Sequence, residues 1–383
     1  MIPRPRALEH IRQVFQVHPV AALLGPRQCG KTTLARILGK QEPSVYFDLE
    51  DPLDVRRLSA PMRALESLTG LVIIDEVQRR PDLLELLRVL VDRFENQARF
   101  LLLGSASPHL VRGISESLAG RIGFVDLSGF NLSEVGQENR NLLWARGGFP
   151  RSFLAPHDAA SMMWRQDFVR TFLERDIPQL GITIPAETLR RFWSMVAHYH
   201  GQVWNGAEFA RSLGTSEHTA RRYLDILAGA YMVRVLPPWF ENIGKRQIKA
   251  PKIYIRDSGI LHALLQLNSL EDLLGHPKLG ASWEGFALEQ VVAAFETRDI
   301  YFWRTHAGAE LDLLLMIKGK RYGFEFKYAD APGTNRSMHI AVRDLGLDHL
   351  WVVYPGHERY SLDERITTVP LELIWEVAKK RGT

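Results

Sequence analysis

Short apolar runs separated by helix-like stretches dominate the first third of the chain. Five of these runs are apolar enough to form buried strands, at residues 20–24, 45–47, 71–74, 100–103 and 123–125. Between them, apolar positions recur with a helical period over residues 32–38, 53–68, 83–94 and 108–118. Such alternation is typical of a parallel sheet with helices on both faces. We therefore expect residues 1–130 to form an α/β domain of this kind.

The pattern changes after residue 128, where helical periods continue and strand-like runs become rare. Residues 205–212 and 216–228 predict two helices separated by a Leu-Gly turn, and residues 231–236 predict a strand. Helix, turn, helix and strand in this order indicate a winged helix. We expect residues 131–250 to form a helical and winged-helix-like domain.

The remainder of the chain, residues 251–383, again mixes helix and strand patterns and predicts a second α/β domain. Residues 282–295 predict an amphipathic helix. Three strand-like runs follow, at residues 300–304, 310–317 and 321–327.

A two-residue turn at Lys318 and Gly319 sets the pairing of the last two of these strands. Counting back from the turn places Asp312 opposite Glu325, and directly opposed residues share a face of the sheet. Lys327 lies two residues further on and shares the same face. Two carboxylates and a lysine are therefore expected to converge.

The composition limits the classes of protein that fit. The chain has 383 residues, 46% of them hydrophobic and 24% charged, which excludes a largely disordered or fibrous protein. Its net charge of +4 permits a polyanionic partner without requiring one. Cys29 is the one cysteine, which excludes an internal disulfide and suits a reducing cytoplasm. No apolar run approaches the ~18 residues of a membrane helix, and we expect neither a signal peptide nor a membrane partner.

The first predicted strand runs directly into a glycine-rich loop at residues 25–32. The loop fits the phosphate-loop (P-loop) motif G-x-x-x-x-G-K-[ST], with the strand before it and the helix after it that the motif requires. Backbone N–H groups and the helix N-terminus favour phosphate there. Lys31 is expected to reach the β- and γ-phosphates, and the Thr32 hydroxyl to ligate Mg²⁺. The predicted ATP site comprises Gly25, Pro26, Arg27, Gln28, Cys29, Gly30, Lys31, Thr32 and Thr33.

An acidic pair, Asp75 and Glu76, ends the third apolar run. A carboxylate at the end of a strand beside a phosphate loop can hold Mg²⁺, and its neighbour can polarise the attacking water. We assign Asp75 to the metal and Glu76 to the water as general base.

Residues 25–33 together with Ile-Ile-Asp-Glu-Val-Gln-Arg at residues 73–79 make the chain similar to a large set of prokaryotic AAA-type ATPases. The Leu-Gly-Ser-Ala-Ser stretch around Ser105 resembles the fourth strand of these enzymes, with Ser105 as the polar sensor residue. Leu-Ala-Gly-Arg, ending at Arg121, resembles another of their stretches. The resemblance implies that Arg121 reaches the γ-phosphate of a neighbouring subunit in a homo-oligomer. The alternative is an intramolecular salt bridge.

Positive charge concentrates around the predicted winged helix. From Arg211 to Arg256 there are nine Lys or Arg against three Asp or Glu, and nine minus three gives an excess of +6. If this excess lines one surface, DNA binding follows from counterion release. The alternative is a lid or an interdomain joint with a solvated basic face. The residues assigned to nucleic acid are Arg221, Arg222, Lys245 and Arg246.

Opposed carboxylates repel each other, and a divalent metal would remove that penalty. Asp312 and the Glu-Phe-Lys triplet at residues 325–327, with Glu284 on the preceding helix, resemble the PD-(D/E)XK nuclease fold. The resemblance implies a metal site of Glu284, Asp312 and Glu325, with Lys327 beside it. A Glu-Leu dipeptide precedes Asp312, so the proline of the nuclease motif is missing. A retained fold without cutting activity is the alternative.

The succession of motifs resembles uncharacterised prokaryotic AAA-type ATPases with a C-terminal nuclease-like domain. The function expected from it is Mg²⁺-dependent ATP hydrolysis that drives remodelling of DNA or translocation on it. The alternative is a nucleotide-controlled signalling or interaction switch with a non-catalytic C-terminal domain.

Overall fold

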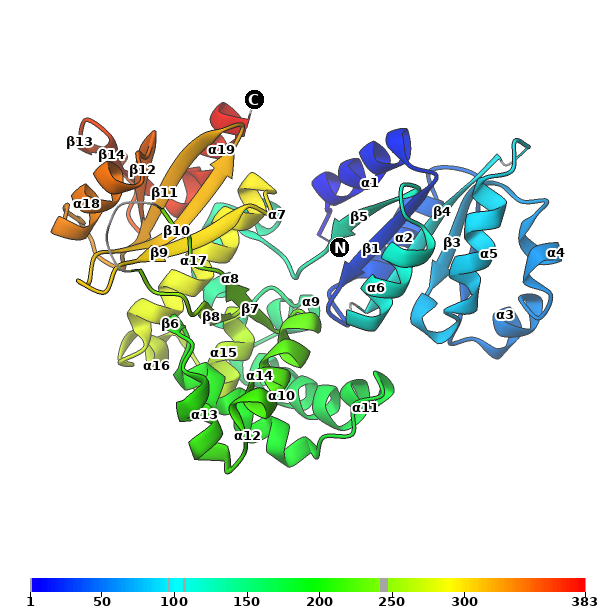
Figure 1. Cartoon of the computed structure of the whole chain (residues 1–383), viewed down its shortest axis with the longest axis horizontal. Coiled ribbons are helices and arrows are strands. Elements are labelled where there is room, and N and C mark those ends of the chain that lie inside the picture. The colour runs from blue at the N-terminus through cyan, green and yellow to red at the C-terminus, as the bar shows by residue number, and fades with distance from the viewer. Residues whose placement is uncertain (1, 96, 106–107, 242–246, 383) are drawn as a thin grey trace. The chain divides into compact units, whose positions relative to one another are not determined.

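The computed structural model in Figure 1 describes residues 2–95, 97–105, 108–241 and 247–382. It divides into two compact units. The first unit contains Met1–Phe130 and Gly229–Tyr231, and the second contains Asn131–Ala228 and Met232–Thr383.

Five parallel strands form the sheet of the first unit, in the order β2-β3-β4-β1-β5. The strands are β1 (Val20–Gly25), β2 (Ser44–Asp48), β3 (Thr69–Asp75), β4 (Gln97–Ser105) and β5 (Ile122–Asp126). Each contains one of the five apolar runs, so the predicted parallel sheet is confirmed.

Alternate residues of β1 face two separate cores. Leu23 packs with Ile11 of α1 and Leu34 of α2, whereas Leu24 packs with Leu87 of α5 on the other face. Helices therefore cover both faces of the sheet, as predicted. The helices of this unit are α1 (Pro5–Val17), α2 (Lys31–Gly39), α3 (Pro52–Arg57), α4 (Pro61–Leu65), α5 (Asp82–Val91) and α6 (Pro108–Ser117).

The helical stretch predicted over residues 53–68 forms two short helices, α3 and α4. Pro61 is the first residue of α4. Proline lacks an N–H and disfavours helical backbone in the residue before it, so the helical period continues across a break in the helix.

The second unit begins with helices that surround a small antiparallel sheet, of order β6-β8-β7. No helix in the described ranges is both long enough and apolar enough to cross a bilayer. The strands of the small sheet are β6 (Gln202–Val203), β7 (Val233–Leu236) and β8 (Lys252–Ile255). The helices of this part of the second unit are α7 (Leu132–Val135), α8 (Arg140–Arg146), α9 (Pro150–Phe153), α10 (Asp158–Thr171), α11 (Ile177–Gln179), α12 (Ala186–His198), α13 (Gly206–Leu213), α14 (Glu217–Gly229), α15 (Ser258–Leu264) and α16 (Leu270–Leu274).

Helices α13 and α14 form the predicted helix-turn-helix, with Gly214 in the left-handed region at φ 65° between them. The strand β7 follows α14 and pairs with β8. The winged-helix interpretation of this arrangement stays a prediction. The expected boundary after residue 250 falls inside the small sheet, because β8 begins at Lys252 and lies between β6 and β7.

A six-stranded mixed sheet of order β13-β14-β12-β11-β10-β9 completes the second unit. Strands β9, β10 and β11 are antiparallel neighbours, and β11, β12 and β14 run parallel. The elements are α17 (Leu279–Phe295), β9 (Ile300–Arg304), β10 (Glu310–Ile317), β11 (Lys320–Phe326), α18 (Arg336–Asp344), β12 (His349–Tyr354), β13 (Ser361–Asp363), β14 (Ile366–Pro370) and α19 (Ile374–Gly382).

The hairpin between β10 and β11 has the predicted register, since Ile317 pairs with Lys320 and Leu313 with Phe324. Its two turn residues both have positive φ, at 49° and 77°. Such a turn matches the twist of the flanking strands, so two residues suffice to connect them.

Candidate functional site

The phosphate loop joins the end of β1 to the start of α2. A Cβ atom on Gly25 would lie 2.0 Å from the carbonyl oxygen of Leu127, so only glycine fits there. Gly30 has a φ of 101°, which also favours glycine. Because α2 begins directly after the loop, the first N–H groups of the helix and its dipole favour an anion there.

Lys31 folds back over this loop. Its side chain is 7% exposed, and its Nζ donates to the carbonyl oxygens of Gly25 at 3.0 Å and Pro26 at 2.7 Å. These acceptors carry no net charge, so the ammonium charge is available to an anion at the loop.

Asp75 collects hydrogen bonds from three directions at the end of β3. Its Oδ2 accepts from the Thr32 hydroxyl at 2.8 Å and from the Tyr46 hydroxyl at 2.5 Å, and its Oδ1 accepts from the Glu76 N–H. Burial raises the pKa of Tyr46, and its bond to Asp75 adds to the shift. A hydroxyl beside a carboxylate is an all-oxygen donor set, which fits Mg²⁺. Tyr46 was not among the predicted site residues; it lies on β2, the strand next to β3.

Glu76 lies directly after the strand, with a positive φ of 56°. Its carboxylate accepts from the Gln78 amide and lies 4.0 Å from the Arg27 guanidinium. Burial raises the pKa of Glu76, while Arg27 opposes the shift. The carboxylate is thus held beside the loop by side chains that leave it half-buried.

Among the remaining predicted loop residues, Cys29 has structural contacts. Cys29 is fully buried, with its Sγ 3.4 Å from the Leu127 carbonyl oxygen. Arg4 donates to the Cys29 carbonyl oxygen at 3.2 Å. Thr33 is exposed, and Gln28 has a positive φ of 63°.

Arg121 forms a bidentate ion pair with Asp92, at 2.6 and 2.7 Å. Both residues belong to the first unit, so the intramolecular alternative of the sequence analysis is the arrangement present here. The side chain of Ser105 lies outside the described residues.

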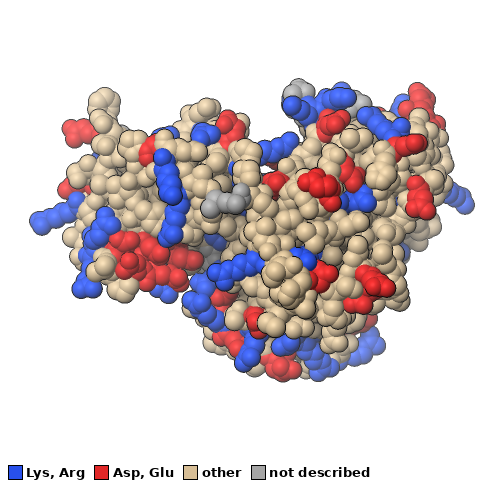
Figure 2. All heavy atoms as spheres, turned by 180° about the vertical axis from the view of Figure 1, so that it is seen from behind, with Lys and Arg blue, Asp and Glu red and all other residues tan. Residues whose placement is uncertain are grey.

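Among the residues that the structure describes, the basic excess between Arg211 and Arg256 does not line one surface. Arg234 and Arg256 both pair with Glu289, which lies outside that segment, and Lys252 is buried among carboxylates. In the view of Figure 2, Lys and Arg are spread over the surface rather than gathered into one patch.

Of the four residues assigned to nucleic acid, two can be placed. Arg221 is exposed and pairs with Asp225 at 2.9 Å, one turn along α14, and Arg222 is exposed on the same helix. Lys245 and Arg246 lie outside the described residues.

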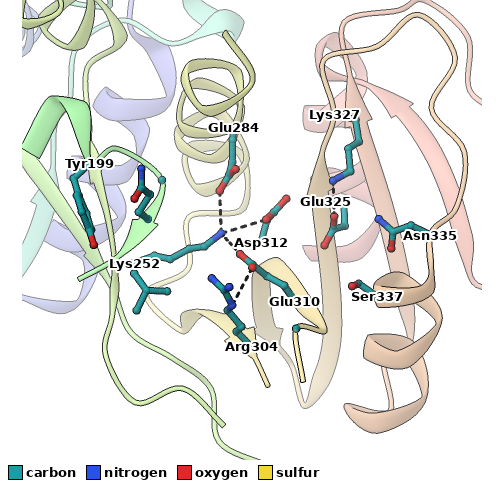
Figure 3. A pocket seen from close by; sticks show the side chains of 14 residues that line it. Tyr199, Lys252, Glu284, Arg304, Glu310, Asp312, Glu325, Lys327, Asn335 and Ser337 are labelled. Carbon is teal, nitrogen blue, oxygen red and sulfur yellow. Dashed lines mark hydrogen bonds and ion pairs between the residues drawn. The ribbon is translucent and has the colours of Figure 1, made fainter. Parts of the chain in front are cut away.

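The carboxylates expected in the C-terminal sheet do come together. Asp312 Oδ2 accepts from the N–H of Phe326 at 3.1 Å, beside Glu325 on the neighbouring strand. Lys327 Nζ lies 3.0 Å from Glu325 Oε2. Glu284 of α17 lies in the same cavity, which has a volume of about 560 Å³ (Figure 3).

A cation that was not among the predicted site residues, Lys252 of β8, lies at the centre of this cavity. Its Nζ lies 3.2 Å from Glu284 Oε1 and 3.3 Å from Asp312 Oδ1, and it also pairs with Glu310. Figure 3 shows the lysine reaching across the cavity into these carboxylates. In the sequence, Lys252 is part of the basic excess, and nothing near it in the chain indicates its carboxylate partners.

The pKa values of the carboxyl groups reflect this crowding. Burial, together with the nearby Asp312 charge, raises the pKa of Glu284 to about 7 and that of Glu325 to about 8. Burial works to lower the pKa of Lys252, but the surrounding carboxylates, Glu284 foremost, raise it well above its ordinary value. The lysine is therefore charged.

A buried histidine fixes β8 against α17. His200 Nδ1 accepts from the N–H of Ile255, and burial lowers the pKa of His200 to about 3, so its ring is neutral. A Cβ atom on Gly285 would lie 2.2 Å from His200 Nε2. Tyr254 of β8 donates to Glu284 Oε1 at 2.6 Å. These contacts place β8, which carries Lys252, next to α17, which carries Glu284.

The arrangement does not fit the metal site that the nuclease resemblance implies. Within the described residues, no three His, Cys, Asp or Glu side chains form a group that could hold a metal ion. The oxygens of Glu284 and Asp312 that would face such an ion point instead to Lys252 Nζ.

The fold and the loop geometry define a class of protein. A family model described as an AAA domain matches residues 17–136, which carry the phosphate loop, Asp75 and Glu76. The first unit is an AAA-type P-loop domain, and the chain is an ATP-hydrolysing enzyme. Two models described as domains of unknown function, DUF8612 and DUF4143, match residues 137–271 and 279–374.

The family itself is shown by two mycobacterial proteins. The chain is 53% identical to the uncharacterized protein Rv2008c of Mycobacterium tuberculosis over 374 residues, which cover 98% of this chain and 85% of the relative. The same figures hold for the uncharacterized protein Mb2031c of Mycobacterium bovis. The chain belongs to the family of these two proteins.

Among solved structures, the Walker-type ATPase PABY2304 of Pyrococcus abyssi is similar with a TM-score of 0.49 and 15% identity. The similarity covers 69% of this chain and 96% of that one.

Proposed function

We propose that this chain is a Mg²⁺-dependent ATPase that acts on DNA. The observation that carries the Mg²⁺ dependence is the 2.8 Å contact between the hydroxyl of Thr32 and the carboxylate of Asp75. This contact joins the phosphate-loop helix to the end of β3, and the two oxygens are the ligand types that Mg²⁺ takes beside a triphosphate.

Each of these residues of the first unit has a separate role in the proposed binding and hydrolysis of ATP. Lys31 binds the β- and γ-phosphates, and Thr32 and Asp75 hold the ion, directly or through water. The ion neutralises phosphate charge when it is bound. Glu76 orients the attacking water and accepts its proton, a role that its raised pKa favours.

ATP turnover with Mg²⁺ and with excess chelator tests the metal dependence. We expect turnover to require the ion, and Asp75→Asn to weaken the response to Mg²⁺ more than Asp48→Asn, a substitution at the end of the neighbouring strand. Equal turnover in chelator would contradict the proposal.

The DNA part of the proposal is supported by α13 and α14, which form a helix-turn-helix with Arg222 exposed. Duplex and branched DNA at low salt should bind the chain and stimulate ATP turnover, because phosphate contacts release counterions. Arg222→Ala should weaken binding more than Arg221→Ala, since Asp225 already pairs with Arg221.

A nucleotide-controlled interaction switch is the second candidate. It is favoured by the pairing of Arg234 and Arg256 with Glu289, which leaves less basic surface for DNA than the sequence suggests. Turnover that is indifferent to DNA, with no DNA binding at low salt, would favour the switch over a DNA-directed ATPase.

The role of Arg121 across subunits also belongs to the proposal. In a homo-oligomer, Arg121 would have to exchange its pair with Asp92 for the γ-phosphate of a neighbour. Turnover per chain should then rise with protein concentration in the native chain and lose that dependence in Arg121→Ala. Turnover that is independent of concentration in an assembled sample would argue against this role.

A further inference from the structure

The cavity of the second unit contains nearly balanced charge. Four carboxylates and three cations line it, and each cation lies in an ion pair with at least one carboxylate. The carboxylates are Glu284, Glu310, Asp312 and Glu325, and the cations are Lys252, Arg304 and Lys327.

Lys252 is placed as a central ion would be. An ammonium carries three donors, and three carboxylates surround its Nζ: Glu284 and Asp312, at 3.2 and 3.3 Å, and Glu310. A divalent ion would need the same oxygens at ~2.0–2.6 Å. The ammonium and such an ion therefore exclude each other.

The backbone holds the lysine in this position. Lys252 pairs with Val203 on one side and with Leu236 on the other, so β8 cannot slide without breaking both ladders. Its side chain is 3% exposed, and its Nζ lies 5.9 Å from the centre of the Phe302 ring. Separating a buried ammonium from its carboxylates costs free energy, because the positive and the negative groups are both left without a partner of opposite charge.

We propose that Lys252 is the resident cation of this site, standing where the sequence pattern predicts a divalent metal, so that the native chain takes up neither Mg²⁺ nor Mn²⁺ there. The lysine holds the carboxylates of Glu284, Glu310 and Asp312 together without a metal. It cannot supply an ion-bound hydroxide as a nucleophile, so metal-dependent cutting of a phosphodiester is not supported at this site. The proposal goes beyond the ATPase function and does not depend on it.

Titration of the full-length chain with Mn²⁺ in the absence of nucleotide tests the proposal, with free Mn²⁺ followed by electron paramagnetic resonance. The native chain and Asp312→Asn should bind equally, because any binding near Asp75 is common to both. Loss of a bound Mn²⁺ ion in Asp312→Asn would overturn the proposal.

Lys252→Met keeps the length of the side chain and removes its charge. It should bind an additional Mn²⁺ ion, which the double variant Lys252→Met with Asp312→Asn should lose. Lys252→Arg, which keeps the charge, should bind no more than the native chain. A folded Lys252→Met that binds no more Mn²⁺ than the native chain would contradict the proposal.

Loss of the buried charge can also destabilise Lys252→Met, and unfolding then serves as the readout. All nine tryptophans of the chain lie between Trp144 and Trp375, in the second unit, so their fluorescence reports on that unit. Mn²⁺ should raise the melting temperature of Lys252→Met and leave that of the native chain unchanged, because a ligand stabilises only the state that binds it. If the variant does not fold even with Mn²⁺, the comparison of the native chain with Asp312→Asn decides.

Discussion

Two buried lysines of this chain lie beside oxygen atoms, but the oxygens differ in charge. Lys31 donates to the backbone carbonyls of Gly25 and Pro26, whereas Lys252 is surrounded by carboxylates. A charge held by neutral dipoles can still attract an anion, and a charge neutralised by carboxylates attracts it far less. The same residue type therefore serves phosphate binding at one site and takes the place of a divalent metal ion at the other.

Removal of the Lys31 ammonium should abolish most ATP turnover. We expect Lys31→Ala to lower kcat by roughly 10²-fold or more, since a lost charge-stabilising contact typically costs that much. Phosphate release measures it. Lys40→Ala, at the exposed C-terminal end of the same helix, should turn over ATP normally. Near-native turnover in Lys31→Ala would disprove the assignment.

Replacement of the Glu76 carboxylate should separate binding from hydrolysis. Glu76→Gln keeps the shape and the contact with Gln78 but cannot accept a proton, so ATP should bind with native affinity and remain uncleaved. Calorimetry and single-turnover kinetics give the two quantities. Equal losses of binding and turnover would instead indicate a structural role.

The raised pKa of Glu76 also sets the direction of the pH dependence. A general base must be deprotonated, so turnover should fall as the pH drops through the pKa of Glu76. Because burial raises that pKa, the acid limb of the kcat profile should lie above 4.5, the ordinary pKa of a glutamate. An acid limb at or below that value would contradict the role.

At the scale of the elements, the packing of β8 against α17 depends on one glycine. A side chain at Gly285 would collide with His200, which is held by the N–H of Ile255. Overpacking of this kind costs about 1–3 kcal/mol, so Gly285→Ala should lower the midpoint of the tryptophan-detected unfolding transition.

A second glycine of α17 supplies the control. A Cβ atom on Gly280 meets nothing within 4 Å, so Gly280→Ala should be neutral or stabilising by up to about 1 kcal/mol. If the two variants shift the unfolding midpoint alike, the contact with His200 does not determine the packing.

Local patterns predict local structure well in this chain. The register of β10 and β11 follows from a two-residue turn and the period of two, because both strands lie within a few residues of the turn. Lys252 could not be placed in the same way. Its partners Glu284 and Asp312 lie 32 and 60 residues away in the sequence, on elements that meet only in the folded unit.

At the scale of the molecule, the sequence predicts the first unit more completely than the second. Five apolar runs, a P-loop motif and an acidic pair define the sheet and its ATP site, since a parallel sheet brings strand ends to one edge. In the second unit the small sheet contains strands from both sides of the expected boundary at residue 250. Hydrophobic periods give no information on which distant strand completes a sheet.

The crowded carboxyl groups predict how the stability of the second unit varies with pH. The folded pKa values of Glu284 and Glu325, about 7 and about 8, lie above the ordinary 4.5. Stability from the protonated forms is therefore full below that ordinary value and is lost as the pH rises through 7 and 8. The free energy of unfolding should fall by up to about 1.4 kcal/mol per pH unit for each proton released.

Denaturant titrations followed by tryptophan fluorescence measure this decline. Glu325→Gln cannot ionise, so its unfolding free energy should change less with pH than that of the native chain. Glu358→Gln, at an exposed position outside the cavity, should keep the native slope. An unchanged slope in Glu325→Gln would show that this group does not titrate as expected.

The position of β8 has a consequence for anyone who dissects this protein by family boundaries. Lys252 falls within the match at residues 137–271, whereas the carboxylates that it neutralises fall within the match at residues 279–374. A truncated piece that starts at the second boundary leaves the lysine behind and presents bare acidic groups. Such a piece would acquire an affinity for divalent ions that the intact protein lacks. A DNA-nicking assay on it would therefore measure a property of the truncated piece and not of the intact protein.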